Sequence, residues 1–523
     1  TTAISQLTID QVGAFSAPQI AGLSTDQIGV LTSTEVQNFA ATQTGALTPS
    51  QLHGLTTTAL SNFSSDQIGG LTTAQLQSLT TTQLNALSVD MLDAVDVTKA
   101  TNGQISGLST TAVSQLTIDQ VGAFSAGQIA SLSADQFGSL TSAEVQSFTT
   151  TQANALTSTQ LSGLTTTALG NFASDQIGAL TTNQLQGLTT TQLNGLSIDS
   201  LDAVDLTKIS TSQLVGLNTT SIGELTTTQV SGFSTSQVAS LTTSQFGALS
   251  QAEVQAFTTT QANALTTAQI RGLTTTAVNM FSSTQIGALA TTQAQSLTTT
   301  QLNSLSIDSL DAVDVTKINA PQVTGLSTTS ISNLTTVQVG TFSSTQIASL
   351  TTSQIGTLTG NEVQAFTSTQ TNAFTTTQLG SLATAAFDLF SSDQIYGFTT
   401  TQLQSLTTTQ LNAVSIDTLQ AVDTTKFGWN QIRGLTTTSI SELTDQQVAA
   451  LNSTEISLLS TAQIGALTST DIQAFTTTQT SALTTRQLSG LTTTAIGLFS
   501  SDQIGAFSTT QLQSLTTTQL NAL

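Results

Sequence analysis

Apolar and polar positions follow a fixed eight-residue pattern along nearly the whole chain. Residues 71–87 read LTTAQLQS, LTTTQLNA and L. In this unit, which we call an octad, a large apolar residue is followed by Thr or Ser, two variable residues, Gln, a second apolar residue, a variable residue and a small one. The apolar positions are five and three residues apart, so a strand would place them on opposite faces. The pattern therefore favours short helices over the alternative, a Thr-rich β-solenoid, which the strand preference of Thr and Val suggests.

One octad contains the signals of a complete helix start. With Thr80 as the N-cap, Gln83 falls on the third helical position, where the two residues form a capping box. Leu79 then precedes the cap and Leu84 occupies the fourth helical position, which is the spacing of a hydrophobic staple. We expect a new helix to begin in every octad.

Other residues agree with this register. Pro18, Pro49 and Pro321 fall on the first or second helical position, where a missing N–H costs little. Most acids lie at the N-cap or in the first turn, and Arg271 and Arg433 lie near the opposite ends, as the helix dipole favours. The last position is usually Gly, Ala or Ser, which predicts a left-handed helix end or close packing.

A helix of about six residues is marginal alone, because nucleation is costly. Each must bury its two apolar side chains against neighbours, which predicts an all-α fold: a narrow solenoid of short capped helices around a continuous Leu, Ile, Val and Phe core. Phe15, Phe39 and Phe63 are spaced three octads apart. A three-sided turn would stack such rings in a ladder, although duplication of a three-octad unit explains the spacing equally well.

A longer repeat, of thirteen octads plus five extra residues, contains the octads. The segment LDAVD begins at Leu92, Leu201 and Leu310, and LQAVD begins at Leu419. We therefore expect residues 1–523 to form one continuous array, an excerpt of a longer chain. Its copies would lie at 1–109, 110–218, 219–327, 328–436 and, in part, 437–523.

The five extra residues form the one unusual segment, which we call the joint. They read VDVTK, VDLTK, VDVTK and VDTTK, and they contain all four lysines of the chain. Acids clustered before each Lys would suit calcium, which prefers oxygen ligands, but the Lys opposes a cation. The favoured interpretation is a structural joint without a cofactor, in which Asp pairs with Lys. Its candidate residues are Asp96, Lys99, Asp205, Lys208, Asp314, Lys317, Asp423 and Lys426.

Composition narrows the function. The chain has 29 acids against 7 Lys and Arg, a net charge of −22, which disfavours nucleic acid and anionic membranes as partners. It has no apolar run long enough for a membrane span, and no Cys. Enzymes need mixed acids, bases and nucleophiles around a pocket, so we expect no enzyme. His53, Trp429 and Tyr396 each occur in one copy only; we interpret the His as a solvated side chain and the two aromatic residues as packing variants.

Near-identical blocks of about a hundred residues, poor in Lys and lacking Cys, resemble the stalk regions of giant repetitive bacterial surface proteins and adhesins. The resemblance implies a secreted fibre or stalk and carries over no binding residues. We expect a non-enzymatic structural rod or filament at the cell surface or outside the cell. Its partners would be further copies of itself or neighbouring surface material. The alternative is a distributed binding surface for polysaccharide, a mineral or ice.

Overall fold

The computed structural model describes residues 2–523, and these residues are all-helical. They form 62 α-helices of four to six residues and three short 3₁₀ helices, and no strand occurs among them. The helical prediction is therefore confirmed, and the β-solenoid alternative is wrong. The chain divides into two units, Thr1–Ala264 and Leu265–Leu523, which are described separately below.

Each octad begins a helix, as the capping signals predicted. Helix α10 (Thr81–Leu84) starts at the N-cap Thr80, whose N–H donates to Gln83 Oε1 at 2.7 Å. Gln83 N–H donates in return to Thr80 Oγ1 at 3.2 Å, which completes the capping box. Leu79 and Leu84, the predicted staple pair, are both buried. Local sequence therefore sets where each helix starts.

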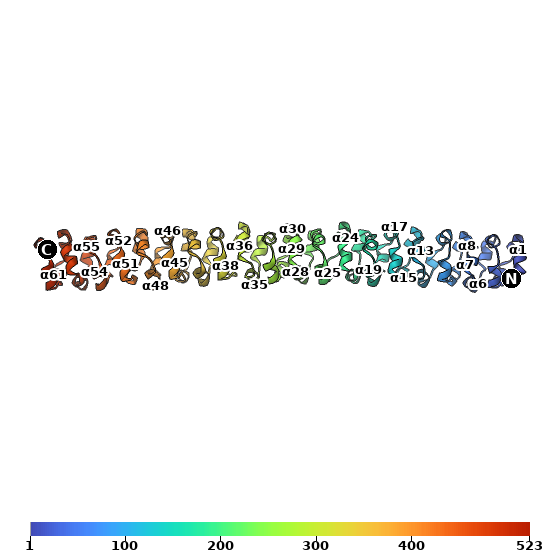
Figure 1. Cartoon of the computed structure of the whole chain (residues 1–523), viewed down its shortest axis with the longest axis horizontal. Helices are drawn as coiled ribbons and strands as arrows, with labels where there is room; N and C mark the ends of the chain where they lie inside the picture. Colours follow the sequence, from blue (N-terminus) through green and yellow to red (C-terminus); the bar gives the residue numbers. More distant parts are fainter. Residues whose placement is uncertain (1) are drawn as a thin grey trace. The chain divides into compact units, whose positions relative to one another are not determined.

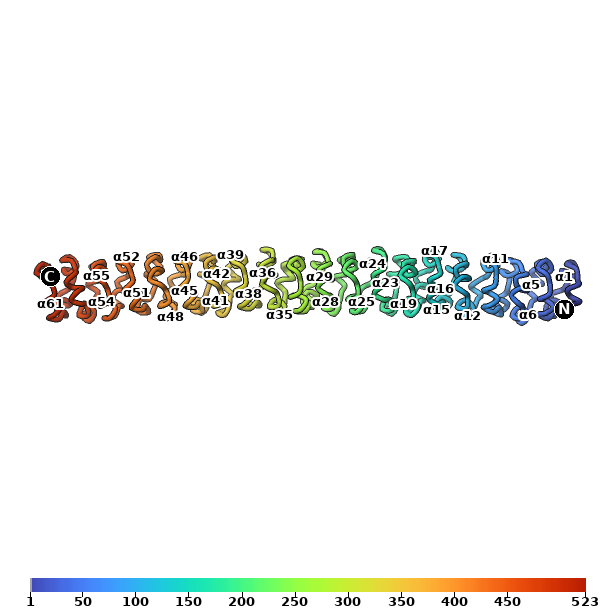
Figure 2. Tube along the Cα trace, in the orientation of Figure 1, coloured from blue at the N-terminus to red at the C-terminus, as the bar shows by residue number. Residues whose placement is uncertain are grey.

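Three successive helices make one turn of a solenoid in each unit. In the first unit, α3 (Thr25–Gly29) packs against α6 (Pro49–Gly54), and α6 packs against α9 (Thr73–Ser78). In the second unit, α51 (Trp429–Gly434) packs against α54 (Ser453–Leu458). Figures 1 and 2 show the short helices winding in successive turns within each unit. Each helix is thus stacked on the helix three positions earlier.

Aromatic rings stack between turns of the core. Phe233 and Phe257, which lie three octads apart in the sequence, have ring centroids 6.5 Å apart. Phe137 stacks against both Phe148 and Phe172, with centroid distances of 5.9 and 5.4 Å. Three octads therefore complete a turn, and Phe233 and Phe257 meet at this spacing. Duplication of a three-octad unit stays an alternative explanation of the spacing.

The octad Gln joins each helix start to the turn below. Besides capping its own helix, Gln83 donates from Nε2 to the carbonyl oxygens of Leu52 and Leu55, both at 2.8 Å. These carbonyls lie at the end of α6, four helices earlier. Gln487 repeats the arrangement in the second unit. One amide therefore bonds to backbone groups at the start of one helix and at the end of another, where the Leu52 carbonyl also accepts from Leu55 N–H.

This bridge explains why one sequence expectation is wrong. No described residue has a positive φ angle, so left-handed helix ends do not occur in residues 2–523. The Gln amides already satisfy carbonyls at the helix ends, and no left-handed turn is needed for them. The small residues serve close packing instead: a Cβ on Gly54 would lie 2.6 Å from Thr25 Cγ2 on the neighbouring turn.

The predicted positions of Pro at helix starts and of two Arg residues near helix ends are confirmed. Pro49 is the first residue of α6, and Pro18 and Pro321 are the second residues of α2 (Ala17–Ala21) and α38 (Ala320–Gly325). Arg271 and Arg433 lie in the last turns of their helices.

Candidate functional site

The joint begins with an aspartate that caps a tight turn. Asp96 Oδ1 accepts from Thr98 N–H at 3.2 Å and from the Thr98 hydroxyl at 2.5 Å, at the start of the 3₁₀ helix η2 (Val97–Lys99). Lys99 N–H donates to the Asp96 carbonyl at 3.0 Å. The last joint repeats these bonds at η3 (Thr424–Lys426).

Every joint lysine is paired with the aspartate three residues before it. The Nζ to Oδ2 distances are 3.2 to 3.6 Å for Lys99–Asp96, Lys208–Asp205, Lys317–Asp314 and Lys426–Asp423. The sequence-predicted residues are therefore brought together in all four copies. Their role as a joint stays a prediction.

Three of the lysines also make the contact that Gln makes elsewhere. Lys99 Nζ donates to the Leu71 carbonyl at 3.1 Å, and Lys317 and Lys426 donate to the equivalent carbonyls at 3.0 and 2.9 Å. Each acceptor lies 28 residues upstream, as it does for an octad Gln. The Lys ammonium thus substitutes for the Gln amide in a unit too short to form a full helix.

The joint takes the place of one helix in the three-sided turn. η2 packs against α9, and η3 packs against α48 (Thr400–Gln404) before it and α53 (Asp445–Ala449) after it. Beyond the joint, Gln104 donates to carbonyls 28 and 25 residues upstream, whereas Gln83 reaches 31 and 28. The joint unit is therefore three residues shorter than an octad but still forms one side of the three-sided turn.

Hydrogen bonding lowers the pKa of the joint carboxyls. The Thr98 hydroxyl contributes most to the lowered pKa of Asp96, and Lys99 adds to it against the opposing effect of burial. The pKa of Asp205 and that of Asp314 are lowered in the same way. No group of three or more His, Asp or Glu side chains suited to a metal ion occurs in residues 2–523. The described residues therefore include no side-chain cluster with the geometry of a calcium site.

The three single-copy side chains are all exposed. His53 is exposed, and its Nδ1 lies 2.8 Å from the Ser78 carbonyl, so the interpretation as a solvated side chain is confirmed. Trp429 is 55% exposed and Tyr396 66% exposed. Neither side chain fills the core, and the Tyr396 ring centroid lies 5.5 Å from Lys426 Nζ, so their interpretation as packing variants stays a prediction.

Sequence reasoning missed a buried acid in each copy. Glu144 caps its helix through Thr141 N–H at 2.7 Å, but a carboxylate has no amide hydrogen for the helix end below. An acid recurs at this position in every copy of the longer repeat, which was the available signal, and each is buried: Glu35, Glu144, Glu253, Glu362 and Asp471. Burial raises the pKa of Asp471, whose Oδ1 is buried without a hydrogen-bond partner.

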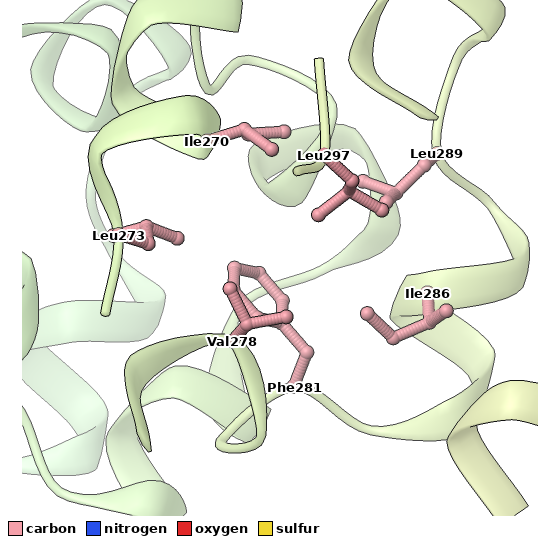
Figure 3. A pocket seen from close by; sticks show the side chains of 7 residues that line it. All are labelled: Ile270, Leu273, Val278, Phe281, Ile286, Leu289 and Leu297. Atoms are coloured by element: carbon pink, nitrogen blue, oxygen red, sulfur yellow. The ribbon is translucent and has the colours of Figure 1, made fainter. Parts of the chain in front are cut away.

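The core of the second unit contains a void that is too small for a ligand. The side chains drawn in Figure 3 surround a void in the second unit, whose volume is about 10 Å³. This volume approaches the minimum for one water molecule, which would also need polar partners. The lining is entirely apolar: Ile270, Leu273, Val278, Phe281, Ile286, Leu289 and Leu297. The void is therefore a packing defect of the core.

Among residues 2–523, no helix has the length and apolar character needed to cross a membrane.

Comparison with known proteins gives one local similarity. No curated protein matches the chain. Residues 206–243, which include the joint residue Lys208 and the octads that follow it, match the family model of the ALTTAQ repeat. This part of the chain is thus similar to a known family of repeats.

Proposed function

We propose that the array is a structural shaft, a non-enzymatic rod or filament at the cell surface or outside the cell. The observation that supports it most is the Gln bridge, which repeats in octad after octad and joins each helix only to near neighbours, as with Gln184 to Ala153 and Leu156. Stability in such arrays is a sum of unit and nearest-neighbour terms, so copies add length without creating a new pocket.

The N-cap hydroxyls also support a shaft over a binding surface made of Thr ranks. Thr80 Oγ1 accepts from Gln83 N–H and donates to Gln83 Oε1 at 3.0 Å, so its hydrogen-bonding capacity is used within the octad. Association with further copies or with neighbouring surface material belongs to this proposal. The acidic balance, with a net charge of −22, disfavours nucleic acid as a partner.

Deleting two copies tests the shaft. With three helices per turn, each turn would add about 9 Å to the shaft, the distance between packed helices. Removal of residues 219–436 preserves the register of the repeats. We expect electron microscopy to show a shaft shortened in proportion, while attachment per molecule stays constant.

Two outcomes would contradict the proposal. An unchanged length would show that the copies do not extend a shaft. Attachment that falls in proportion to the copies removed would indicate a binding surface distributed along the repeats.

A further inference from the structure

The fourth joint differs from the first three at several positions. Trp429 stands where the earlier copies have Asn102, Thr211 and Ala320. Gly428 replaces Thr, Ser and Asn, Tyr396 replaces three glycines, Asn452 replaces three serines, and Glu455 replaces three glutamines. These five substitutions all lie at or near one joint, although the copies also differ at other positions, such as Val337 in place of Thr228 and Ile355 in place of Phe246.

Most of these substituted positions line one open groove in the second unit. The groove has a volume of about 570 Å³ and is broadly open to solvent. It lies among the end of α48, the start of α51 and the start of α54. Its lining is Gln404, Phe427, Gly428, Trp429, Asn452, Ser453, Thr454 and Glu455.

Two of these substitutions remove hydrogen bonds that stabilise the earlier copies. Gly428 provides no side chain to cap α51, whereas Thr101 caps the equivalent helix of the first copy. Glu455 cannot repeat the donation of Gln128 Nε2 to the Val97 and Ala100 carbonyls. Departures from the local rules of a fold concentrate at functional sites. Here one departure removes a side chain from the groove wall. The other places a mostly buried carboxyl group there, whose Oε2 accepts from Asn452 N–H at 2.8 Å.

The groove offers polar groups that the fold leaves unused. Gln77 and Gln186 donate to the carbonyls of their joint lysines at 3.0 and 3.1 Å, whereas Gln404 makes no such bond in the described part of the chain. Asn452 uses its Oδ1 to cap Glu455 N–H at 3.0 Å, which leaves its amide N–H groups toward solvent. The Trp429 indole, 55% exposed, supplies a flat apolar surface beside them.

We propose that this groove binds a neutral saccharide, with one pyranose ring against the face of Trp429 and its hydroxyl groups on Gln404, Asn452 and Glu455. A pyranose combines an apolar C–H face with a rim of hydroxyls, which matches an exposed indole flanked by amides and a carboxyl group. The net charge of −22 and the Glu455 carboxyl group disfavour acidic sugars. This site is discrete and distinct from the proposed shaft function, on which it does not depend.

Trp429 is the only Trp of the chain, so its fluorescence reports on this groove alone. The full chain would be titrated with cellohexaose, maltohexaose and hexa-N-acetylchitohexaose. We expect a saturable change in emission with at least one of them. Trp429→Ala should abolish binding by calorimetry, and Glu455→Gln and Asn452→Ser should each weaken it at least fivefold. All three variants introduce the residue found 109 positions earlier, Ala320, Gln346 or Ser343, which protects the fold.

A matched control moves the indole to the third joint, where Ser343 and Gln346 stand in place of Asn452 and Glu455. The double variant Trp429→Ala, Ala320→Trp places the sole Trp at the equivalent position of the third copy, and we expect it not to bind. Equal binding by this variant, or by Trp429→Ala, would overturn the proposal. So would the absence of any response to the three saccharides, and a response to tetramethylammonium alone would assign the groove to a cation instead. Electron microscopy of Trp429→Ala should show an unchanged shaft length, which distinguishes a failure of the saccharide proposal from a failure of the shaft proposal.

Discussion

At the scale of the residue, the octad Gln is the group on which the fold depends. Its carbonyl oxygen accepts a backbone N–H at the start of its own helix, and its amide nitrogen donates to carbonyls at a helix end one turn below. Gln184 does this with Thr181 N–H at 2.9 Å and with the Ala153 and Leu156 carbonyls at 3.1 and 2.8 Å. A Glu at this position can still accept the backbone N–H of its own helix, but it has no N–H to donate to the helix end below. Gln and Glu are therefore not equivalent here.

Gln184→Glu should therefore weaken the contact between turns. The Leu156 carbonyl loses its donor, whereas the Ala153 carbonyl keeps the N–H of Leu156, and both gain a nearby carboxylate. An unsatisfied buried group costs about 1–3 kcal/mol. Native-state hydrogen exchange would measure the free energy of opening of α22 (Thr182–Gly187). The matched control is Glu144→Gln, which supplies the missing amide and should stabilise its turn. Equal protection of Gln184→Glu and the parent chain would contradict the role assigned to the bridge.

The joint aspartates predict a loss of local stability in acid. The pKa of Asp96 is lower in the folded chain than its usual value of 3.8, chiefly through the Thr98 hydroxyl. Folding therefore favours the carboxylate, and its contribution is complete above the unfolded pKa and lost as pH falls through the lowered one. Hydrogen exchange of residues 96–100 should accelerate below about pH 4, relative to Asp96→Asn at the same pH. Identical pH profiles in the two proteins would rule this out.

At the scale of the element, the joint shows how a unit of five residues can replace one of eight. A full helix does not fit, so a 3₁₀ turn capped by Asp forms one side, and Lys reaches the helix end below. The exposed apolar residue one octad earlier recurs with the joint, as Val89, Ile198, Ile307 and Ile416. Nothing in the structure explains why these residues are apolar.

Lys317→Met should destabilise its joint while preserving the packing of the aliphatic stem. The change leaves the Leu289 carbonyl without the 3.0 Å bond from Nζ and Asp314 without its 3.5 Å ion pair. We expect a loss of about 1–2 kcal/mol in the local free energy of opening, mostly from the carbonyl, since a part-exposed ion pair contributes little. Hydrogen exchange of residues 314–318 measures it.

Two comparisons make this prediction specific. Lys317→Arg keeps the charge and the donors and should have a smaller effect. Addition of EDTA to the parent chain should change nothing at the joint. A marked loss of protection after calcium removal would instead favour the cation site and contradict the joint.

At the scale of the whole molecule, each copy contributes thirteen octads and one joint, so fourteen sides. Fourteen is not a multiple of three, and a feature that occurs once per copy therefore moves to a different side in the next copy. Within each unit, the recurrent Ile or Val and the joints do not share one face. This distribution suits a shaft that presents similar sides in every direction better than a surface with one binding face.

Removal of one whole copy should leave the remaining repeats intact. Deletion of residues 328–436 joins segments in the same register, and the Gln contacts extend only 31 residues upstream. We expect unchanged helicity per residue by circular dichroism and unchanged hydrogen exchange outside the junction. Deletion of residues 328–331 removes half an octad and should instead disrupt the neighbouring turns. Equal changes in helicity and hydrogen exchange after both deletions would contradict the proposal that stability depends on contacts between neighbouring units.

The helices themselves could be predicted from the sequence. A capping box, a staple and the positions of Pro18 and Pro49 are all encoded within a few adjacent residues, so the start of each helix follows from local chemistry. The pairing of Asp96 with Lys99 was accessible for the same reason, because three residues separate them.

Contacts between turns could not be predicted in this way. The Gln bridge to carbonyls 28 and 31 residues upstream, the substitution of Lys99 for Gln and the three-residue shift after each joint depend on which helix ends meet. Exposure of Trp429 and Tyr396 depends on the same stacking. The sequence by itself therefore determined the helices and their caps, since these involve neighbours in the chain. Only the tertiary structure decided which distant carbonyls and side chains face one another, because that is set by three helices closing each turn.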